Sequence, residues 1–170
     1  MHCAEGKNPI SQHVVDPGNL TNEQQHDARF EDQCALWLGR KLNHGCYTKL
    51  NKWGYEIDIL CEVTDTYYCL GECKLVRGGA NKAGERQENA LRQLRDRVNS
   101  ARNSGETVDF ECYVFCNEDF GEEICIQAQV LANELGVKIH LVCVKMLTDW
   151  NKKPDWSLGD QNFKEVYCAG

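Results

Sequence analysis

The sequence has no long hydrophobic run and little proline. No stretch approaches the ~20 consecutive apolar residues that a membrane-spanning helix needs, and residues 1–30 carry acids such as Glu5 and Asp16 instead of the apolar core of a signal peptide. We therefore expect no membrane partner and, by default, a cytoplasmic location. With three prolines and 42% hydrophobic residues in 170, the composition is typical of one globular domain and excludes a disordered chain.

The eleven cysteines lack the spacing of a zinc site or a disulfide framework. Their number is odd, no export signal accompanies them, and the closest pairs, Cys69/Cys73 and Cys112/Cys116, are separated by three residues instead of two. Most lie within apolar strand or helix patterns. We interpret them as reduced thiols of the core. A cysteine-centred metal or redox protein is the competing class, which zinc stoichiometry and thiol titration would distinguish.

Basic residues are in the minority, and the net charge is −7. Such a charge is unfavourable for binding nucleic acid, because phosphates require positive potential. The exception is the segment 74–102, where eight basic and three acidic residues give a net charge of +5. This segment is either a solvated helix face or a local strip that binds phosphates.

Hydrophobic periodicity predicts an α/β sandwich, with a mixed β-sheet covered by helices. The expected helices cover 21–42, 85–102 and 122–135. The expected strands cover 46–53, 56–63, 67–76, 110–116 and 137–144. The order is therefore helix, three strands, helix, strand, helix, strand.

Three regions follow from this order. Residues 1–20 form an N-terminal arm, 21–146 the domain, and 147–170 a tail that packs on or near it. Aromatic side chains of the tail, such as Trp150 and Trp156, either cover the edge of the sheet or mark a dimer surface.

An acidic residue interrupts the apolar pattern of the second strand. Regular alternation places Ile57 and Ile59 on one face and Asp58 on the other, together with Glu56 and Leu60.

The neighbouring strand brings a second acid to the same place. A turn at 64–66 would pair Val63 with Tyr67 and put Asp58 opposite Glu72. Directly opposed carboxylates repel each other unless a cation lies between them. A hard divalent ion with oxygen ligands, Mg²⁺ or Mn²⁺, would remove the conflict. The alternative is that both side chains face water.

Two helices direct polar side chains inward. Glu31 lies in the middle of the apolar stripe formed by Cys34, Leu38 and their neighbours, and Gln87 lies on the face of Ala90 and its neighbours. Inward polar groups are rare unless something pairs with them. Each is either part of a site with the hairpin or a frayed or satisfied structural group.

Three segments together resemble a known family. Phe30-Glu31, Glu56-Ile57-Asp58-Ile59-Leu60 and Gly71-Glu72-Cys73-Lys74 closely resemble the PD-(D/E)XK nucleases, in particular the Mrr-like restriction endonuclease branch. The resemblance covers 27–144. Ile57 stands where the family has proline, and Cys73 where an apolar residue is more common.

The resemblance implies a restriction-endonuclease-like fold and metal-dependent hydrolysis of phosphodiester bonds in DNA. Asp58, Glu72 and the Cys73 carbonyl would hold Mg²⁺ or Mn²⁺, which polarises the scissile phosphate. Lys74 would orient the attacking water and help lower its pKa, and Glu31 would either hold a metal-bound water or complete the metal's coordination shell.

The remaining candidates bind or position the substrate. Gln87 completes the candidate catalytic set, and Arg77, Lys82 and Arg86 are expected to position the nucleic-acid strand. An RNA-cleaving nuclease and a non-catalytic interaction module remain as alternatives. The acidity of the chain favours a homodimer or a partner recognition subunit that supplies affinity.

Overall fold

The structure is a computed structural model that describes residues 19–170. Residues 1–18, most of the expected N-terminal arm, lie outside the described residues. The helices are α1 (Asn22–Leu42), α2 (Ala83–Asn103) and α3 (Glu122–Leu135). The strands are β1 (Tyr47–Lys52), β2 (Tyr55–Thr64), β3 (Tyr67–Lys74), β4 (Asp109–Cys116), β5 (Lys138–Val144) and β6 (Phe163–Ala169).

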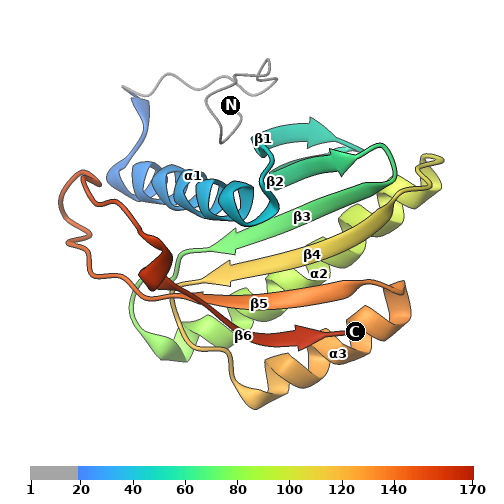
Figure 1. Ribbon diagram of the computed structural model, residues 1–170. Helices are drawn as coiled ribbons and strands as arrows, with labels where there is room; N and C mark the ends of the chain where they lie inside the picture. Colours follow the sequence, from blue (N-terminus) through green and yellow to red (C-terminus); the bar gives the residue numbers. More distant parts are fainter. Residues whose placement is uncertain (1–18) are drawn as a thin grey trace.

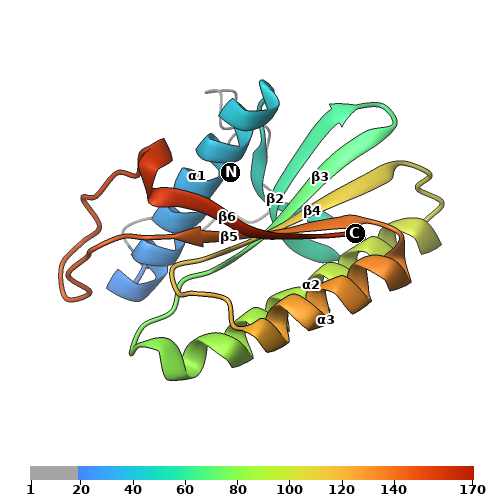
Figure 2. The same ribbon diagram turned by 60° about the horizontal axis from the view of Figure 1, so that its bottom comes forward.

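The six strands form one mixed sheet in chain order. The β3–β4 and β4–β5 pairs are parallel, and the other three pairs are antiparallel. Helix α1 covers one face over β1 to β3, whereas the crossover helices α2 and α3 cover the other (Figures 1 and 2). The chain is therefore an α/β protein, as the periodicity predicted. Within residues 19–170, no helix combines the length and the apolar character needed to cross a bilayer.

Helix α1 begins where its capping residues require. The Thr21 hydroxyl accepts from the Gln24 N–H at 3.1 Å, and the Gln24 side chain accepts from the Thr21 N–H at 3.0 Å. This reciprocal pair satisfies two N–H groups that would otherwise lack partners. The helix ends at Asn43, whose left-handed φ of 51° closes the last turn.

The sheet has a hydrophobic core on each face, and most of the cysteines pack in one of these two cores. None of the ten cysteines within residues 19–170 is in a disulfide. Seven of them are buried: Cys34, Cys46, Cys61, Cys69, Cys112, Cys116 and Cys143. The interpretation of most of these thiols as small apolar groups is confirmed.

The alternation of β2 breaks at Asp58, which corrects the expected face pattern. Ile59 packs in the core under α1, but Ile57 packs in the opposite core, together with Leu60. Asp58 and Lys49 lie between the paired positions on either side of the break, and Lys49 has a positive φ of 53°. A positive φ is uncommon for a residue with a side chain. Here it changes the direction of β1 at Lys49, opposite the break at Asp58.

The pairing of β2 with β3 also differs from the expectation in one detail. Thr64, and not Val63, pairs with Tyr67, and an irregularity lies between Glu62 and Thr64. The irregularity restores the expected register further along, where Ile59 pairs with Gly71. The pairing of the two strands ends at Ile59 and Gly71. Asp58 and Glu72, the adjacent residues on the two strands, lie just beyond the last pair.

The C-terminal segment contributes a strand that the sequence pattern did not predict. Strand β6 pairs with β5 at the edge of the sheet, with a register shift between Leu141 and Val142. Tyr167 pairs with Leu141 and Glu165 with Val142, so Val166 is an extra residue. The bulge destroys the period of two on which strand prediction depends.

The rest of the C-terminal segment packs against α1. Trp150 and Trp156 contact the His26 ring, with centroid distances of 5.2 and 6.1 Å. Phe163 stacks on Trp37 at 5.1 Å. These aromatic contacts fasten the segment to the described domain, so they assign the tryptophans to packing within the chain.

Gly71 provides a stability test at the centre of the sheet. A Cβ at this position would lie 3.1 Å from the Ile59 Cβ and 3.4 Å from the Phe115 ring. We expect Gly71→Ala to lower the free energy of unfolding by about 1–3 kcal/mol, because the packed core cannot yield space. Urea denaturation measures the change. The matched control is Gly84→Ala in the first turn of α2, where no atom lies within 4 Å and helix propensity favours alanine. Equal stability of the two variants would contradict the packing argument.

Candidate active site

A small cavity lies where α1 meets the ends of β2 and β3. Its volume is about 170 Å³. It is lined by Asp27, Phe30, Glu31, Asp58, Cys73, Lys74, Leu75 and Arg86. The structure thus brings together five of the residues singled out from the sequence: Glu31, Asp58, Cys73, Lys74 and Arg86.

Asp58 occupies the gap where β2 and β3 separate. Its side chain is half-buried, and its Oδ2 accepts from the Cys73 backbone N–H at 2.9 Å. A side-chain oxygen therefore takes the place of a strand-to-strand hydrogen bond. This bond fixes the carboxylate beside β3, where the Asp58 charge raises the pKa of both Glu31 and Glu72.

Glu72 lies behind Asp58, on the face covered by α2. Its side chain is 1% exposed, and its Oε1 lies 2.9 Å from the Arg97 Nε. Burial raises the pKa of Glu72 well above its usual value, and the neighbouring Asp58 carboxylate raises it further, against the opposing effect of Arg97. Oε1 makes the ion pair but lacks the alignment of a hydrogen bond. Glu72 does not line the cavity.

Glu31 carries the second strongly perturbed carboxyl group. Burial and then the Asp58 charge raise its pKa to about 8, although Lys49 opposes the shift. The Lys49 Nζ lies 2.8 Å from the Glu31 Oε2. The positive φ of Lys49 therefore has a consequence for the site, because it turns this lysine toward α1.

The three carboxylates fit a hard divalent cation in their donor chemistry. Their ligand atoms are all oxygens, which Mg²⁺ and Mn²⁺ prefer, and burial leaves their negative charge only partly compensated. They do not, however, form a group in which all three ligand atoms lie within 4.8 Å of one another; within residues 19–170, His140, Glu165 and Cys168 do. Among the three carboxylates, Asp58 is the one that interacts with both of the others, Glu31 and Glu72.

Lys74 supplies the positive charge closest to these acids on β3. Its side chain is 9% exposed and lines the cavity. It also lowers the pKa of Glu72, so the two groups interact electrostatically. A buried ammonium group beside a carboxylate pair is placed to orient a polar ligand in the cavity.

The basic strip is only partly available for phosphates, which corrects the sequence interpretation. The Arg77 guanidinium contacts the Glu23 and Asp27 carboxylates at 3.0 and 3.2 Å and lies 5.0 Å from the Trp150 ring centre. Arg77 thus joins the loop after β3 to α1 and the C-terminal segment. Arg86 is exposed and lines the cavity, and Lys82 is exposed just before α2.

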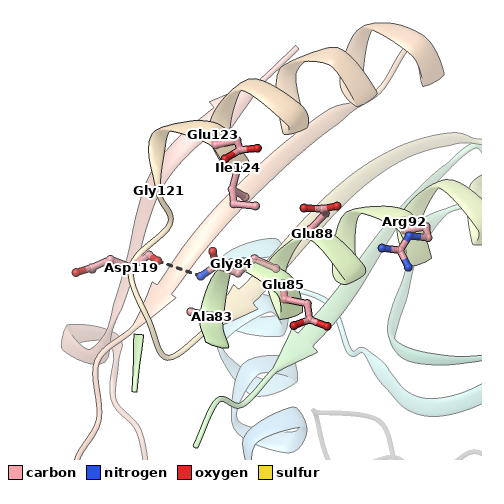
Figure 3. Close-up of a pocket in the computed structure, with 10 residues that line it drawn as sticks. Ala83, Gly84, Glu85, Glu88, Arg92, Asp119, Gly121, Glu123 and Ile124 are labelled. Atoms are coloured by element: carbon pink, nitrogen blue, oxygen red, sulfur yellow. Dashed lines mark hydrogen bonds between the residues drawn. The ribbon is translucent and has the colours of Figure 1, made fainter. Parts of the chain in front are cut away.

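Gln87 is not part of this cavity, which corrects its place in the catalytic set. It is 1% exposed, and its amide donates to the carbonyls of Glu118 and Asp119 at 3.3 and 3.0 Å. It lines a separate cavity of about 530 Å³ between the starts of α2 and α3 (Figure 3). Its inward direction is explained by the loop that it holds after β4.

Three residues at or beside the candidate site were not identified from the sequence. Asp27 had a signal, because it lies four residues before Glu31 on the same helix face. Arg97 also had one, because it follows Ala90 by seven residues and shares the buried face of α2. Lys49 had none, since its position depends on a backbone conformation that the local residues do not dictate.

Comparisons with known proteins give no relative for this chain. No family model, no curated protein and no solved structure matches it. Functional inference must therefore come from the residues and geometry of the site.

The raised pKa of Glu31 predicts a pH-dependent stability. The pKa of Glu31 is about 8 in the folded state, against 4.5 ordinarily. The folded state therefore binds this proton more tightly than the unfolded state, and the resulting stabilisation is fully present below about pH 4.5. That contribution is lost as the pH rises through about 8. We expect Glu31→Gln to be more stable than the parent by about 2 kcal/mol near pH 9, and to lose this advantage near pH 4. Denaturant titrations across pH measure the difference. The exposed Glu88→Gln variant is the control, and a constant difference across pH would contradict the assignment.

The buried Glu72–Arg97 pair predicts a second effect. We expect Arg97→Met to lower the free energy of unfolding by about 3 kcal/mol at pH 8, because the Glu72 charge loses its partner. The loss should shrink as the pH falls, because burial and Asp58 raise the pKa of Glu72 and a protonated Glu72 needs no cationic partner. Adding Glu72→Gln should recover most of the stability. The control is Arg92→Met on the exposed face of α2, and equal losses in the two arginine variants would refute the pairing.

Proposed function

We propose that this chain is a Mg²⁺-dependent nuclease of the PD-(D/E)XK type that hydrolyses phosphodiester bonds in DNA. The observation that carries the proposal is the convergence of Glu31, Asp58 and Lys74 on one cavity, with Glu72 directly behind. These residues come from a helix and two strands, and each belongs to the motif that the sequence resembles. The mixed sheet with helices on both faces is compatible with the restriction-endonuclease-like fold, which is part of the proposal.

Asp58 is the principal metal ligand in this proposal. Glu72 and the Cys73 carbonyl are the further ligands, and Glu31 completes the shell from α1. A divalent cation there would supply a Lewis acid that polarises the phosphate and offsets charge on its oxygens. The perturbed pKa values of Glu31 and Glu72 support this role, because a cation would favour their ionised forms.

The protein's own groups handle the water and its proton. The Lys74 ammonium donates hydrogen bonds that orient the water for in-line attack on phosphorus. The Glu31 carboxylate, which lines the same cavity from α1, is the group that accepts the proton. The cavity walls formed by Phe30 and Leu75 restrict the access of bulk water to these groups.

Arg86 is the substrate-positioning residue with the strongest support. It is exposed at the rim of the cavity and electrostatically close to Asp27. Lys82, one turn earlier, extends the positive charge along the start of α2. Phosphate contacts of this kind set the position of a strand and carry no base sequence. A homodimer or a separate recognition subunit would add affinity to a chain with a net charge of −7.

Two variants test the mechanism. We expect Asp58→Ala and Lys74→Ala each to lower Mg²⁺-dependent cleavage by at least about 100-fold while the circular dichroism spectrum stays unchanged. The assay uses circular and linear duplex DNA, single-stranded DNA and RNA, each with Mg²⁺, Mn²⁺ or EDTA.

The matched control is Asp65→Ala, an exposed acid in the turn of the same hairpin, which should cleave at the parental rate. Retained cleavage in either site variant would reject the mechanism. Preferential cleavage of RNA would keep the site but change its substrate. Binding of nucleic acid without cleavage of any substrate would favour a non-catalytic module.

A further inference from the structure

A second cluster of metal-ligating side chains lies on the last two strands, away from the candidate active site. It consists of His140 on β5 with Glu165 and Cys168 on β6. One ligand atom of each residue lies within 4.8 Å of the other two. None of these residues lines the cavity around Asp58, so the cluster is not part of the proposed nuclease chemistry.

The bulge in β6 creates this cluster. His140 pairs with Cys168, and Glu165 pairs with Val142, two positions along β5. Residues two apart share a face of a strand, so His140 and Val142 point the same way. In a regular β6, Glu165 and Cys168 would point to opposite faces, because three positions separate them. The extra residue, Val166, brings both to the face of His140.

His140 is held in the manner of a metal-binding imidazole. Its Nε2 lies 2.6 Å from a Glu111 carboxylate oxygen. The Tyr67 and Tyr113 hydroxyls donate to the Glu111 carboxylate at 3.0 and 3.3 Å, and the imidazole stacks on the Tyr113 ring at 4.3 Å. A carboxylate on the distal nitrogen fixes the ring and leaves Nδ1 to face a ligand, which is the usual support for a metal-bound histidine.

The two residues on β6 are accessible and chemically suitable. Glu165 is exposed on the edge strand, and its Oε1 lies 2.5 Å from the His140 Nδ1. Cys168 is exposed as well, unlike the core thiols. The Glu165 Oε1 also lies 3.9 Å from the Lys41 Nζ, so an ion bound between these groups would replace a long ion pair at the surface.

We propose that His140, Glu165 and Cys168 form a three-ligand site for a borderline divalent cation of the Zn²⁺ class. Nitrogen, thiolate and carboxylate donors are those that Zn²⁺ uses, and three protein ligands leave a fourth position for water or another ligand. The thiolate disfavours Mg²⁺, which requires oxygen donors. On binding, Cys168 and His140 Nδ1 each reach the ion in their unprotonated forms and release any proton they carry to solvent.

Metal titration of the whole chain tests the site. Zn²⁺ is titrated by calorimetry and by competition with a chromophoric chelator, and Co²⁺ is used to detect thiolate-to-metal charge-transfer absorption. We expect one tight equivalent in the parent, and at least about a tenfold loss of affinity in Cys168→Ser and in Glu165→Gln, since even an outer partner of a ligand contributes that much. Glu111→Gln should lower affinity by about 10–100-fold without removing the Co²⁺ absorption.

The matched control is Cys125→Ser, which changes a half-buried thiol on α3 and should bind metal as the parent does. Asp58→Ala should also bind Zn²⁺ normally, so the result is independent of nuclease activity. Because Cys168 and Glu165 are exposed, their variants should keep the parental circular dichroism spectrum. Absence of tight Zn²⁺ binding in the parent, or unchanged affinity and Co²⁺ absorption in Cys168→Ser, would overturn the proposal.

Discussion

The repulsion among the carboxylates around Asp58 is the constraint on which the candidate site depends. Asp58 lies where the pairing of β2 with β3 stops, and it perturbs Glu31 on one side and Glu72 on the other. Each acid has a cationic neighbour from a different element: Lys49 of β1 for Glu31 and Arg97 of α2 for Glu72. These pairs compensate the acids only in part, since burial and then the Asp58 charge keep the pKa values of Glu31 and Glu72 raised. In the proposed function, a bound divalent cation would offset the remaining negative charge.

The fold was largely readable because its core follows simple periods. Helix α3 was predicted with its observed bounds, and α1 to within its capping residue, because apolar stripes and capping residues agree there. The order of the first five strands followed from alternation and turn residues in the same way. Strand β6 was not predictable, since the bulge at Val166 and the exposed edge position remove the alternation. Local pattern fails where tertiary pairing, and not the sequence period, determines the strand.

The residues of the candidate site could be predicted from the sequence only where the backbone keeps a regular strand or helix geometry. Asp58 and Lys74 were identified because a polar residue that interrupts an apolar strand pattern can be recognised from the sequence alone. The alternation break at Asp58 was not visible, because it depends on the positive φ of Lys49 in the neighbouring strand. Gln87 shows the opposite error: an inward polar side chain was taken as functional, but the loop after β4 satisfies it. Burial of a polar group indicates a partner, and only the structure tells whether the partner is backbone or ligand.

The two proposed metal sites use different donor chemistry, and this difference matters for a chain with both. Around Asp58 the donors are carboxylate and carbonyl oxygens, which suit Mg²⁺ but also bind Zn²⁺, because raw affinity rises across the divalent series. At His140 the nitrogen and thiolate donors prefer Zn²⁺ strongly. A Zn²⁺ ion would thus occupy the site on β5 and β6 first, and reach the carboxylates only in excess. In the two proposals taken together, this difference in donor type would let one chain keep a firmly bound ion on β5 and β6 and an exchangeable ion between β2 and β3.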